Sequence, residues 1–236
     1  MKGVNRLLTS KTVFAKKDVK FISPRTDNQK KYMQLLQKDK PYIVVGSGPA
    51  GTGKTLLSVT AGVQSLIAGR VDRIVITRPA VSVDEQFGFL PGNLEAKMQP
   101  WVRPIHDVLK LNFPLSKVDH MIKEKIVDIV PLAFMRGLTF ERSWIICDEA
   151  QNTTVNQMKM VLTRIGKDSK MVITGDPFQY DRGFDVNGFS DFLQRLENQP
   201  IVDENNESLI DVVHFGEHDV ERHRVIKPIL ELYNDL

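Results

Sequence analysis

The sequence contains very little cysteine and no long apolar run. Its 236 residues include one cysteine, Cys147, so no disulfide can form within the chain. The apolar residues around Cys147 predict a small buried side chain rather than a redox or metal-binding group. No run of 18 or more apolar residues is present, and polar residues follow Lys2 and Arg6 where a secretory signal would be apolar. We therefore expect a soluble, cytoplasmic protein with no membrane partner.

The excess of positive charge is confined to the front of the chain. The whole sequence has a net charge of +3, whereas residues 1–40 hold 11 Lys or Arg against three Asp, a balance of +8. A run of this kind is either a solvated, partly disordered tail or an arm that neutralises nucleic-acid phosphates. We expect residues 1–24 to form a basic N-terminal extension and residues 25–236 a single domain.

Residues 48–55 form a phosphate-binding loop of the pattern G-x-x-x-x-G-K-T, made of Gly48, Pro49, Ala50, Gly51, Thr52, Gly53, Lys54 and Thr55. An apolar strand candidate precedes the loop and a helical run follows it, which is the context that this motif requires. The glycines let successive backbone N–H groups point inward at a triphosphate. Lys54 is suited to the β- and γ-phosphates, and the Thr55 hydroxyl is suited to Mg²⁺.

The rest of the chain alternates short apolar runs with helical stretches, a pattern typical of a parallel α/β sheet covered on both faces. The predicted strands are residues 42–45, 73–77, 127–130, 143–147, 170–174 and 212–215. Six strands predict a doubly wound core. Residues 81–125 contain four prolines and two amphipathic runs, so we expect them to form a helical insertion or lid rather than core.

The strand at residues 143–147 ends in two carboxylates, Asp148 and Glu149. In an open α/β sheet this is the edge that binds ligands. Asp148 is suited to hold Mg²⁺ through a water, and Glu149 to orient and deprotonate the attacking water. The alternative is that the pair caps the helix expected at residues 153–164.

A third polar group follows the strand at residues 170–174. Gln179 is neutral and can both donate and accept hydrogen bonds, which suits it to sensing a γ-phosphate. Asp176, before Pro177, can equally be only a turn former.

Together these motifs resemble the PhoH family of phosphate-starvation-inducible ATPases. The strings that carry the resemblance run from about residue 25 to the C-terminus in the family's order: the phosphate loop, Thr77-Arg-Pro-Ala80, Gly88-Phe-Leu-Pro-Gly92, Phe134-Met-Arg-Gly137, Asp148-Glu-Ala-Gln-Asn-Thr-Thr154, Gln157-Met-Lys-Met160, Thr163-Arg-Ile-Gly166, Gly175-Asp-Pro-Phe-Gln179 and Asp219-Val-Glu-Arg-His223.

The resemblance implies a RecA-like P-loop NTPase core related to superfamily 1 helicases, with ATP as nucleotide and RNA or single-stranded nucleic acid as partner. It also assigns Gln29 to adenine recognition. One departure is Arg136-Gly-Leu-Thr139, where the family commonly has a second arginine in place of Leu138. No spare acidic cluster remains for a two-metal nuclease site, so we expect the short form without a nuclease domain.

Two functions compete. One is a helicase-like ATPase coupled to nucleic acid, and the other is a regulatory module in which ATP switches the conformation of residues 81–125. Arg78, just after the second strand, either contacts the nucleic-acid backbone or forms an ion pair within the core. Because the chain has length for only one RecA-like core, we expect a homo-oligomer, with a hexameric ring favoured.

Such a ring would supply an arginine from the neighbouring chain to the γ-phosphate. Arg222 is the first choice for this residue and Arg164 the second. The alternatives for both residues are a surface arginine or a partner for the carbonyl end of a helix.

Overall fold

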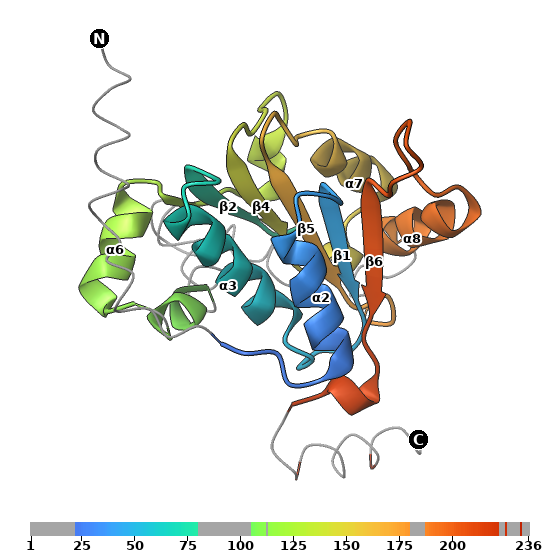
Figure 1. Ribbon diagram of the computed structural model, residues 1–236, viewed down its shortest axis with the longest axis horizontal. Helices are drawn as coiled ribbons and strands as arrows, with labels where there is room; N and C mark the ends of the chain where they lie inside the picture. Colours follow the sequence, from blue (N-terminus) through green and yellow to red (C-terminus); the bar gives the residue numbers. More distant parts are fainter. Residues whose placement is uncertain are drawn as a thin grey trace, which may run out of the picture.

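The computed structural model describes residues 22–79, 105–111, 113–179 and 187–221, together with residues 225 and 232. These residues form one six-stranded sheet with the strand order β3-β2-β4-β5-β1-β6, in which every pairing is parallel. The strands are β1 (Ile43–Ser47), β2 (Arg73–Thr77), β3 (Val127–Ile129), β4 (Ser143–Cys147), β5 (Lys170–Gly175) and β6 (Ile210–His214). Figure 1 shows the sheet between two layers of helices.

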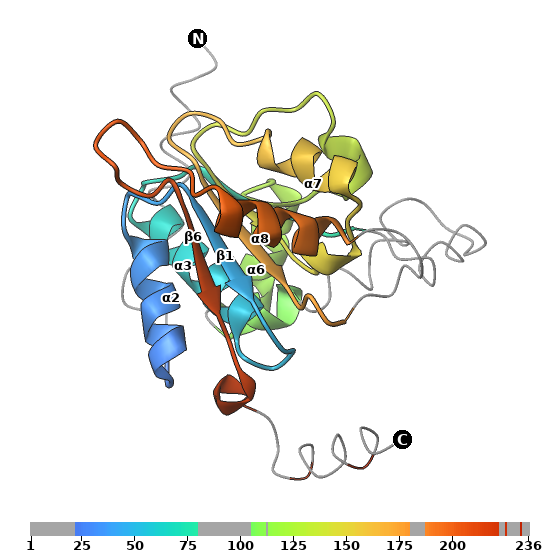
Figure 2. The same ribbon diagram turned by 90° about the vertical axis from the view of Figure 1, so that its right-hand side faces the viewer.

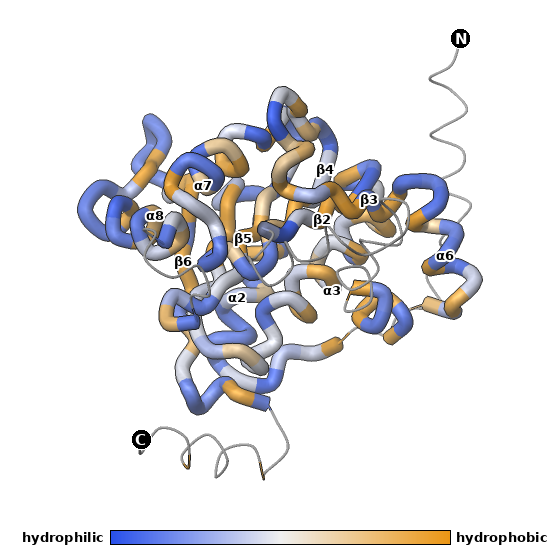
Figure 3. Tube along the Cα trace, turned by 180° about the vertical axis from the view of Figure 1, so that it is seen from behind, coloured by the Kyte–Doolittle hydropathy of each residue, from blue (hydrophilic) through white to orange (hydrophobic). Residues whose placement is uncertain are grey.

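Successive strand residues point to opposite faces, so each central strand contributes to two hydrophobic clusters. Val44, Ile76 and Val172 belong to the cluster under α2 (Asp27–Gln37), α3 (Lys54–Ile67) and α6 (Leu115–Lys123). Val45 and Ile173 belong to the opposite cluster under α7 (Val155–Leu162) and α8 (Gly188–Asn198). Figure 2 shows α2 and α3 on one side of the sheet and α8 on the other, and Figure 3 shows hydrophobic residues concentrated in the central strands.

The helices begin where the sequence provides capping side chains. Thr26 and Gln29 form a reciprocal capping box at the start of α2, and Thr154 and Gln157 form another at the start of α7. The short 3₁₀ helices are η3 (Leu132–Met135), η4 (Ala150–Asn152) and η5 (Glu217–Asp219). Within the described part of the chain, no helix is long and apolar enough to cross a membrane.

The predicted fold class is confirmed. All six strands exist, the sheet is parallel and helices cover both faces, with the phosphate-loop strand β1 between β5 and β6 as in a RecA-like P-loop core. Two of the six predicted strands, residues 73–77 and 143–147, have the predicted limits, and the last one begins two residues earlier than predicted because Ile210 pairs with Ile43. The helix expected at residues 153–164 is shorter, since Thr154 caps it and η4 precedes it.

One prediction needs correction. The described part of the expected lid, residues 105–111 and 113–125, is not separate from the core. Ile105, Leu109, Phe113, Val118 and Met121 are buried in the same cluster as the residues of β2 and α3. This part of the chain therefore covers one face of the sheet, although its prolines and amphipathic runs suggested a lid. Residues 81–104 lie outside the described residues.

Candidate functional site at the carboxyl edge of the sheet

Because all six strands are parallel, their carboxyl ends meet at one edge of the sheet. The phosphate loop follows β1, Arg78 follows β2, Asp148 and Glu149 follow β4, and Asp176 follows β5. Strand β5 lies between β1 and β4, so the loop and the acidic pair are separated by the width of one strand. The sheet order therefore gathers at one edge the polar groups that the sequence distributes over 130 residues.

The phosphate loop depends on backbone conformations that favour glycine. Gly48, Gly51 and Gly53 have φ angles of 140°, 87° and 84°. At Gly48 the fit is especially close, because a Cβ atom there would lie 2.3 Å from the Phe215 carbonyl oxygen. The loop continues directly into α3, whose N-cap is Gly53. The Lys54 ammonium donates to the carbonyl oxygens of Gly48 and Pro49 at 2.6 and 2.7 Å, which places its charge within the loop.

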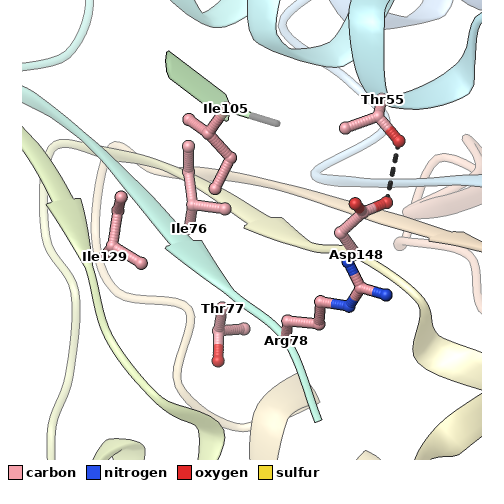
Figure 4. Close-up of a pocket in the computed structure, with 7 residues that line it drawn as sticks. All are labelled: Thr55, Ile76, Thr77, Arg78, Ile105, Ile129 and Asp148. Carbon is pink, nitrogen blue, oxygen red and sulfur yellow. Dashed lines mark hydrogen bonds between the residues drawn. The ribbon is translucent and has the colours of Figure 1, made fainter. Parts of the chain in front are cut away.

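The Thr55 hydroxyl donates a 2.8 Å hydrogen bond to Oδ1 of Asp148 (Figure 4). The same carboxylate oxygen accepts a 2.5 Å hydrogen bond from the Thr174 hydroxyl on β5. Thr55 and Asp148 also line a small pocket together with Arg78 and Ile105. One oxygen group from the first turn of α3 and one from the end of β4 are therefore fixed beside each other, and the Thr174 side chain holds the carboxylate in position.

Glu149 has a left-handed backbone conformation, with φ at 53°, which non-glycine residues seldom adopt. Its Oε2 accepts a 2.6 Å hydrogen bond from the side-chain amide of Gln151, a residue that is 2% exposed. Its Oε1 lies 3.8 Å from a guanidinium nitrogen of Arg78. Both side chains of this ion pair are about one-third exposed, so it lies at the sheet edge rather than within the core.

The acidic pair does not cap α7. Thr154 occupies the N-cap position of that helix, and Glu149 instead precedes the short helix η4 without a side-chain capping hydrogen bond.

The polar segment after β5 is a turn from Asp176 to Gln179. The Asp176 carbonyl accepts from the Gln179 N–H at 3.2 Å, and the Asp176 carboxylate accepts from the Phe178 N–H at 3.1 Å. Asp176 is therefore a turn former, as the sequence allows. Gln151 accepts from the Asp176 N–H at 3.1 Å, so one buried amide joins this turn to Glu149. The Gln179 side chain is exposed on the same turn.

Gln29 lies against the outer side of the phosphate loop. Its side-chain amide donates to the Thr52 carbonyl at 3.1 Å, and its oxygen accepts from the Arg25 N–H at 2.7 Å. Gln29 is 5% exposed, so it joins the start of α2 to the loop.

The segment after β6 contacts the loop from another direction. The Glu221 N–H donates to the Gly51 carbonyl at 3.0 Å, and the Glu221 carboxylate pairs with Arg25 at 2.7 Å. Asp219 is fully buried and accepts hydrogen bonds from Thr26, Asn28 and the Gly216 N–H. Burial tends to raise the pKa of Asp219, but these hydrogen bonds outweigh that effect and hold its pKa below the usual range.

The remaining predicted residues have different outcomes. Arg222 lies outside the described residues. Arg164 donates to the carbonyl oxygens of Met160 and Leu138, so it serves as a partner for the carbonyl end of α7, which is the alternative interpretation given above. Cys147 is buried as predicted, and burial, with a smaller contribution from Asp148, raises the pKa of its thiol to about 12.

The chain is similar to known proteins over most of its length. Residues 21–234 match the family model described as PhoH-like protein. The chain belongs to the PhoH family. It is 41% identical over 218 residues to the PhoH-like protein of Mycobacterium tuberculosis, covering 91% of this chain and 58% of the relative. It is 39% identical over 216 residues to the PhoH-like protein of Bacillus subtilis, covering 91% of this chain and 65% of the relative.

The chain thus spans about three fifths of the length of the curated relatives it matches. Its structure is also similar to the SWI2/SNF2 ATPase core domain of Sulfolobus solfataricus. The TM-score is 0.42, with 13% identity over 70% of this chain and 34% of that chain.

Sequence reasoning assigned no role to several residues that shape this PhoH site. Thr174 and Gln151 fix Asp148 and Glu149, and Asp219 and Glu221 join the C-terminal segment to α2 and the phosphate loop. Gln151, Asp219 and Glu221 lie inside strings that carry the PhoH resemblance, and Thr174 immediately precedes one. Their proximity to the motifs was the available signal, but their partners are residues far apart in the sequence.

Proposed function

We propose that this PhoH protein hydrolyses ATP with Mg²⁺ and couples hydrolysis to single-stranded nucleic acid. The observation that carries the proposal is the 2.8 Å hydrogen bond between Thr55 and Asp148, which joins the phosphate loop to the acidic strand end. A loop of left-handed glycines at a helix N-terminus is suited to a triphosphate, since its N–H groups and the helix dipole both favour anions. In this proposal residues Gly48 to Thr55 bind the phosphates of ATP. Gln29, next to the loop, takes part in recognising the adenine.

The donor set fits Mg²⁺. This ion prefers oxygen ligands, and proteins usually hold it through one or two side chains together with substrate phosphates rather than in a full protein cage. Thr55 and Asp148 would hold the ion, with Thr174 fixing the carboxylate. When bound, Mg²⁺ neutralises charge on the β- and γ-phosphate oxygens.

Glu149 is the proposed general base. A water attacks the γ-phosphorus, its proton passes to the Glu149 carboxylate, and the bond from the γ-phosphorus to the β–γ bridging oxygen breaks to leave ADP and phosphate. Gln151 supports this role because its hydrogen bond restricts the rotation of the carboxylate. Lys54 would stabilise charge on the phosphate oxygens, and Gln179 would sense the γ-phosphate from the turn after β5.

The proposed nucleic-acid partner, RNA or single-stranded DNA, is supported by charge. The balance of +8 in residues 1–40 favours phosphates, and Arg78 offers a partly exposed guanidinium beside Glu149. Each phosphate neutralised should contribute a slope of roughly −0.7 to log affinity against log salt for a single strand. Deleting residues 1–24 and replacing Arg78 with Ala should reduce both the affinity and this slope.

We also propose a homo-oligomer, most simply a hexameric ring. The described residues form one sheet, and in this proposal a neighbouring chain takes the part that the second core plays in a two-core helicase. Arg222 is the proposed arginine that completes the neighbour's γ-phosphate site. The preceding residue, Glu221, donates a hydrogen bond to Gly51 in the phosphate loop of its own chain. The experiment must therefore also test whether Arg222 acts on the γ-phosphate bound by its own chain.

Steady-state ATP hydrolysis, measured with and without single-stranded RNA, tests the proposal. We expect the RNA to stimulate hydrolysis and Lys54→Ala to abolish ATP binding and activity in both conditions. Lys117→Ala, which changes an ammonium near Phe113 rather than one in the loop, is a matched control and should behave as wild type. Hydrolysis without stimulation would favour the nucleotide-switch alternative. Activity that survives Lys54→Ala would contradict the ATPase proposal itself.

A further inference from the structure

Phe178 is the most exposed large hydrophobic residue in the described part of the chain. It is 92% exposed, compared with 70% for Leu232 and 58% for Phe134. A phenylalanine in water gives up the stabilisation that burial would provide. The apolar residues near the carboxyl ends of the neighbouring strands β4 and β5, Cys147 and Ile173, are by contrast fully buried. Phe178 is therefore an exception at the functional edge.

The turn that presents Phe178 is ordered by several contacts. The N–H of Phe178 donates to the Asp176 carboxylate, and the following N–H, from Gln179, donates to the Asp176 carbonyl. Pro177 restricts the backbone between them. Asp176 is 6% exposed and is held by Gln151, so the turn is anchored in the protein interior. The backbone that carries the ring therefore loses little conformational freedom when a ligand covers the ring.

The surroundings of Phe178 favour a flat ligand over a protein surface. The carboxyl edge around β5 carries polar groups: Asp148 and Glu149 on the neighbouring strand and Arg78 on the strand beyond it. Of the other exposed hydrophobic residues, Tyr42 directly precedes β1 and so lies toward the amino edge, whereas Phe134 lies on η3, which follows the edge strand β3. Protein interfaces surround an aromatic anchor with an apolar core, whereas base stacking needs one exposed ring and a cation for the adjoining phosphate, which the partly exposed Arg78 offers.

We propose that Phe178 is a stacking platform for a base of the bound single strand. The proposal rests on the proposed function, because it specifies how the same sheet edge contacts nucleic acid. The ring stacks on a base while Arg78 contacts an adjoining phosphate. The turn shares Gln151 with Glu149, so the base contact is joined through one buried amide to the proposed hydrolytic carboxylate.

Fluorescence anisotropy with a labelled oligouridylate tests this role. The variants are Phe178→Ala, Phe178→Trp and the matched control Phe134→Ala, which removes an exposed ring on η3, the short helix that follows the edge strand β3 rather than β5. We expect Phe178→Ala to weaken binding by about 5- to 150-fold, the usual range for losing one stacked base. Phe178→Trp should bind at least as tightly as wild type, and Phe134→Ala should bind equally.

A strand of equal length that lacks bases separates stacking from charge. Wild type and Phe178→Ala should bind this strand with the same affinity, because its phosphates are unchanged. ATP affinity should also be the same for both proteins, which verifies that the phosphate loop is intact. Loss of affinity for the strand without bases in Phe178→Ala would overturn the inference, since it would indicate a disturbed electrostatic surface.

Other outcomes distinguish this inference from the proposed function. If wild type binds oligouridylate and Phe178→Ala binds it equally well, the stacking role is wrong and the nucleic-acid function stands. If wild type binds no single strand, the proposed function fails and the stacking role fails with it. If Phe178→Ala changes the solution mass without changing affinity, the ring belongs to an interface between copies, which also overturns the inference.

Discussion

The close contact between Gly48 and Phe215 leads to a quantitative prediction about the phosphate loop. In Gly48→Ala the new Cβ would lie 2.3 Å from the Phe215 carbonyl oxygen and 2.9 Å from its carbonyl carbon. Both are backbone atoms, so a side-chain rotation cannot relieve the clash. The φ of 140° adds strain for any residue with a Cβ. Backbone strain and overpacking together predict a loss of roughly 2–5 kcal/mol in the free energy of unfolding.

Gly69→Ala provides the matched control. Gly69 also has a positive φ, 71°, but nothing lies within 4 Å of a Cβ placed there. We expect only the left-handed strain, about 1–2 kcal/mol. Both variants carry a backbone penalty for a positive φ, and only Gly48→Ala adds the contact with Phe215.

The assay is urea unfolding with and without ATP and Mg²⁺. A ligand at 100 times its Kd stabilises the folded state by about 2.7 kcal/mol. Gly69→Ala should retain this stabilisation in full, whereas Gly48→Ala should lose most of it because the loop must shift away from Phe215. Equal stabilisation of both variants by ATP would refute the idea that this contact shapes the nucleotide site.

Three further predictions concern the residues around the loop. Gln151→Ala should lower kcat by up to about 10²-fold with little change in KM, since it frees Glu149 without touching the phosphate loop; a change confined to KM would contradict the positioning role. Asp219→Asn should cost roughly 1–3 kcal/mol near pH 7, because the amide cannot accept all the hydrogen bonds of the carboxylate. The folded pKa of Asp219 lies below the unfolded value of about 3.9, so wild type should lose this stability as the pH falls through the folded pKa, and the Asn variant should lack that part of the acid dependence. Mixing Arg222→Ala chains with Lys54→Ala chains should restore part of the activity that each lacks if the arginine acts across a ring; no recovery in a demonstrably mixed oligomer would exclude a crossing arginine.

The sequence was sufficient for the parts of the site that depend on local spacing. The phosphate loop is one continuous segment, and Asp148 follows an apolar run that can only end at the sheet edge, so its proximity to Thr55 followed from the parallel topology. The limits of the strands could not be predicted as well from the sequence, because pairing with a neighbouring strand decides where a strand begins and ends. Ile210 begins β6 through its pairing with Ile43, a contact that composition does not reveal.

The sequence could not identify contacts between distant segments. Thr174 resembles any strand threonine until β5 is placed beside β4, and Gln151 resembles a polar residue near a helix until its two partners are known. Residues 105–125 were misread for a related reason. Their amphipathic pattern indicates that one side is covered, but it does not indicate whether the cover is a mobile segment or the main core.

The most direct test of the account separates ATP binding from hydrolysis in Glu149→Gln. ATP binding is measured by titration and hydrolysis by phosphate release. Glu141→Gln is the control, since Glu141 is an exposed glutamate just before the amino end of the same strand. The account predicts wild-type ATP affinity for both variants, wild-type hydrolysis for Glu141→Gln, and a loss on the order of 10²- to 10⁴-fold for Glu149→Gln. Hydrolysis by Glu149→Gln at the wild-type rate would contradict the proposed mechanism.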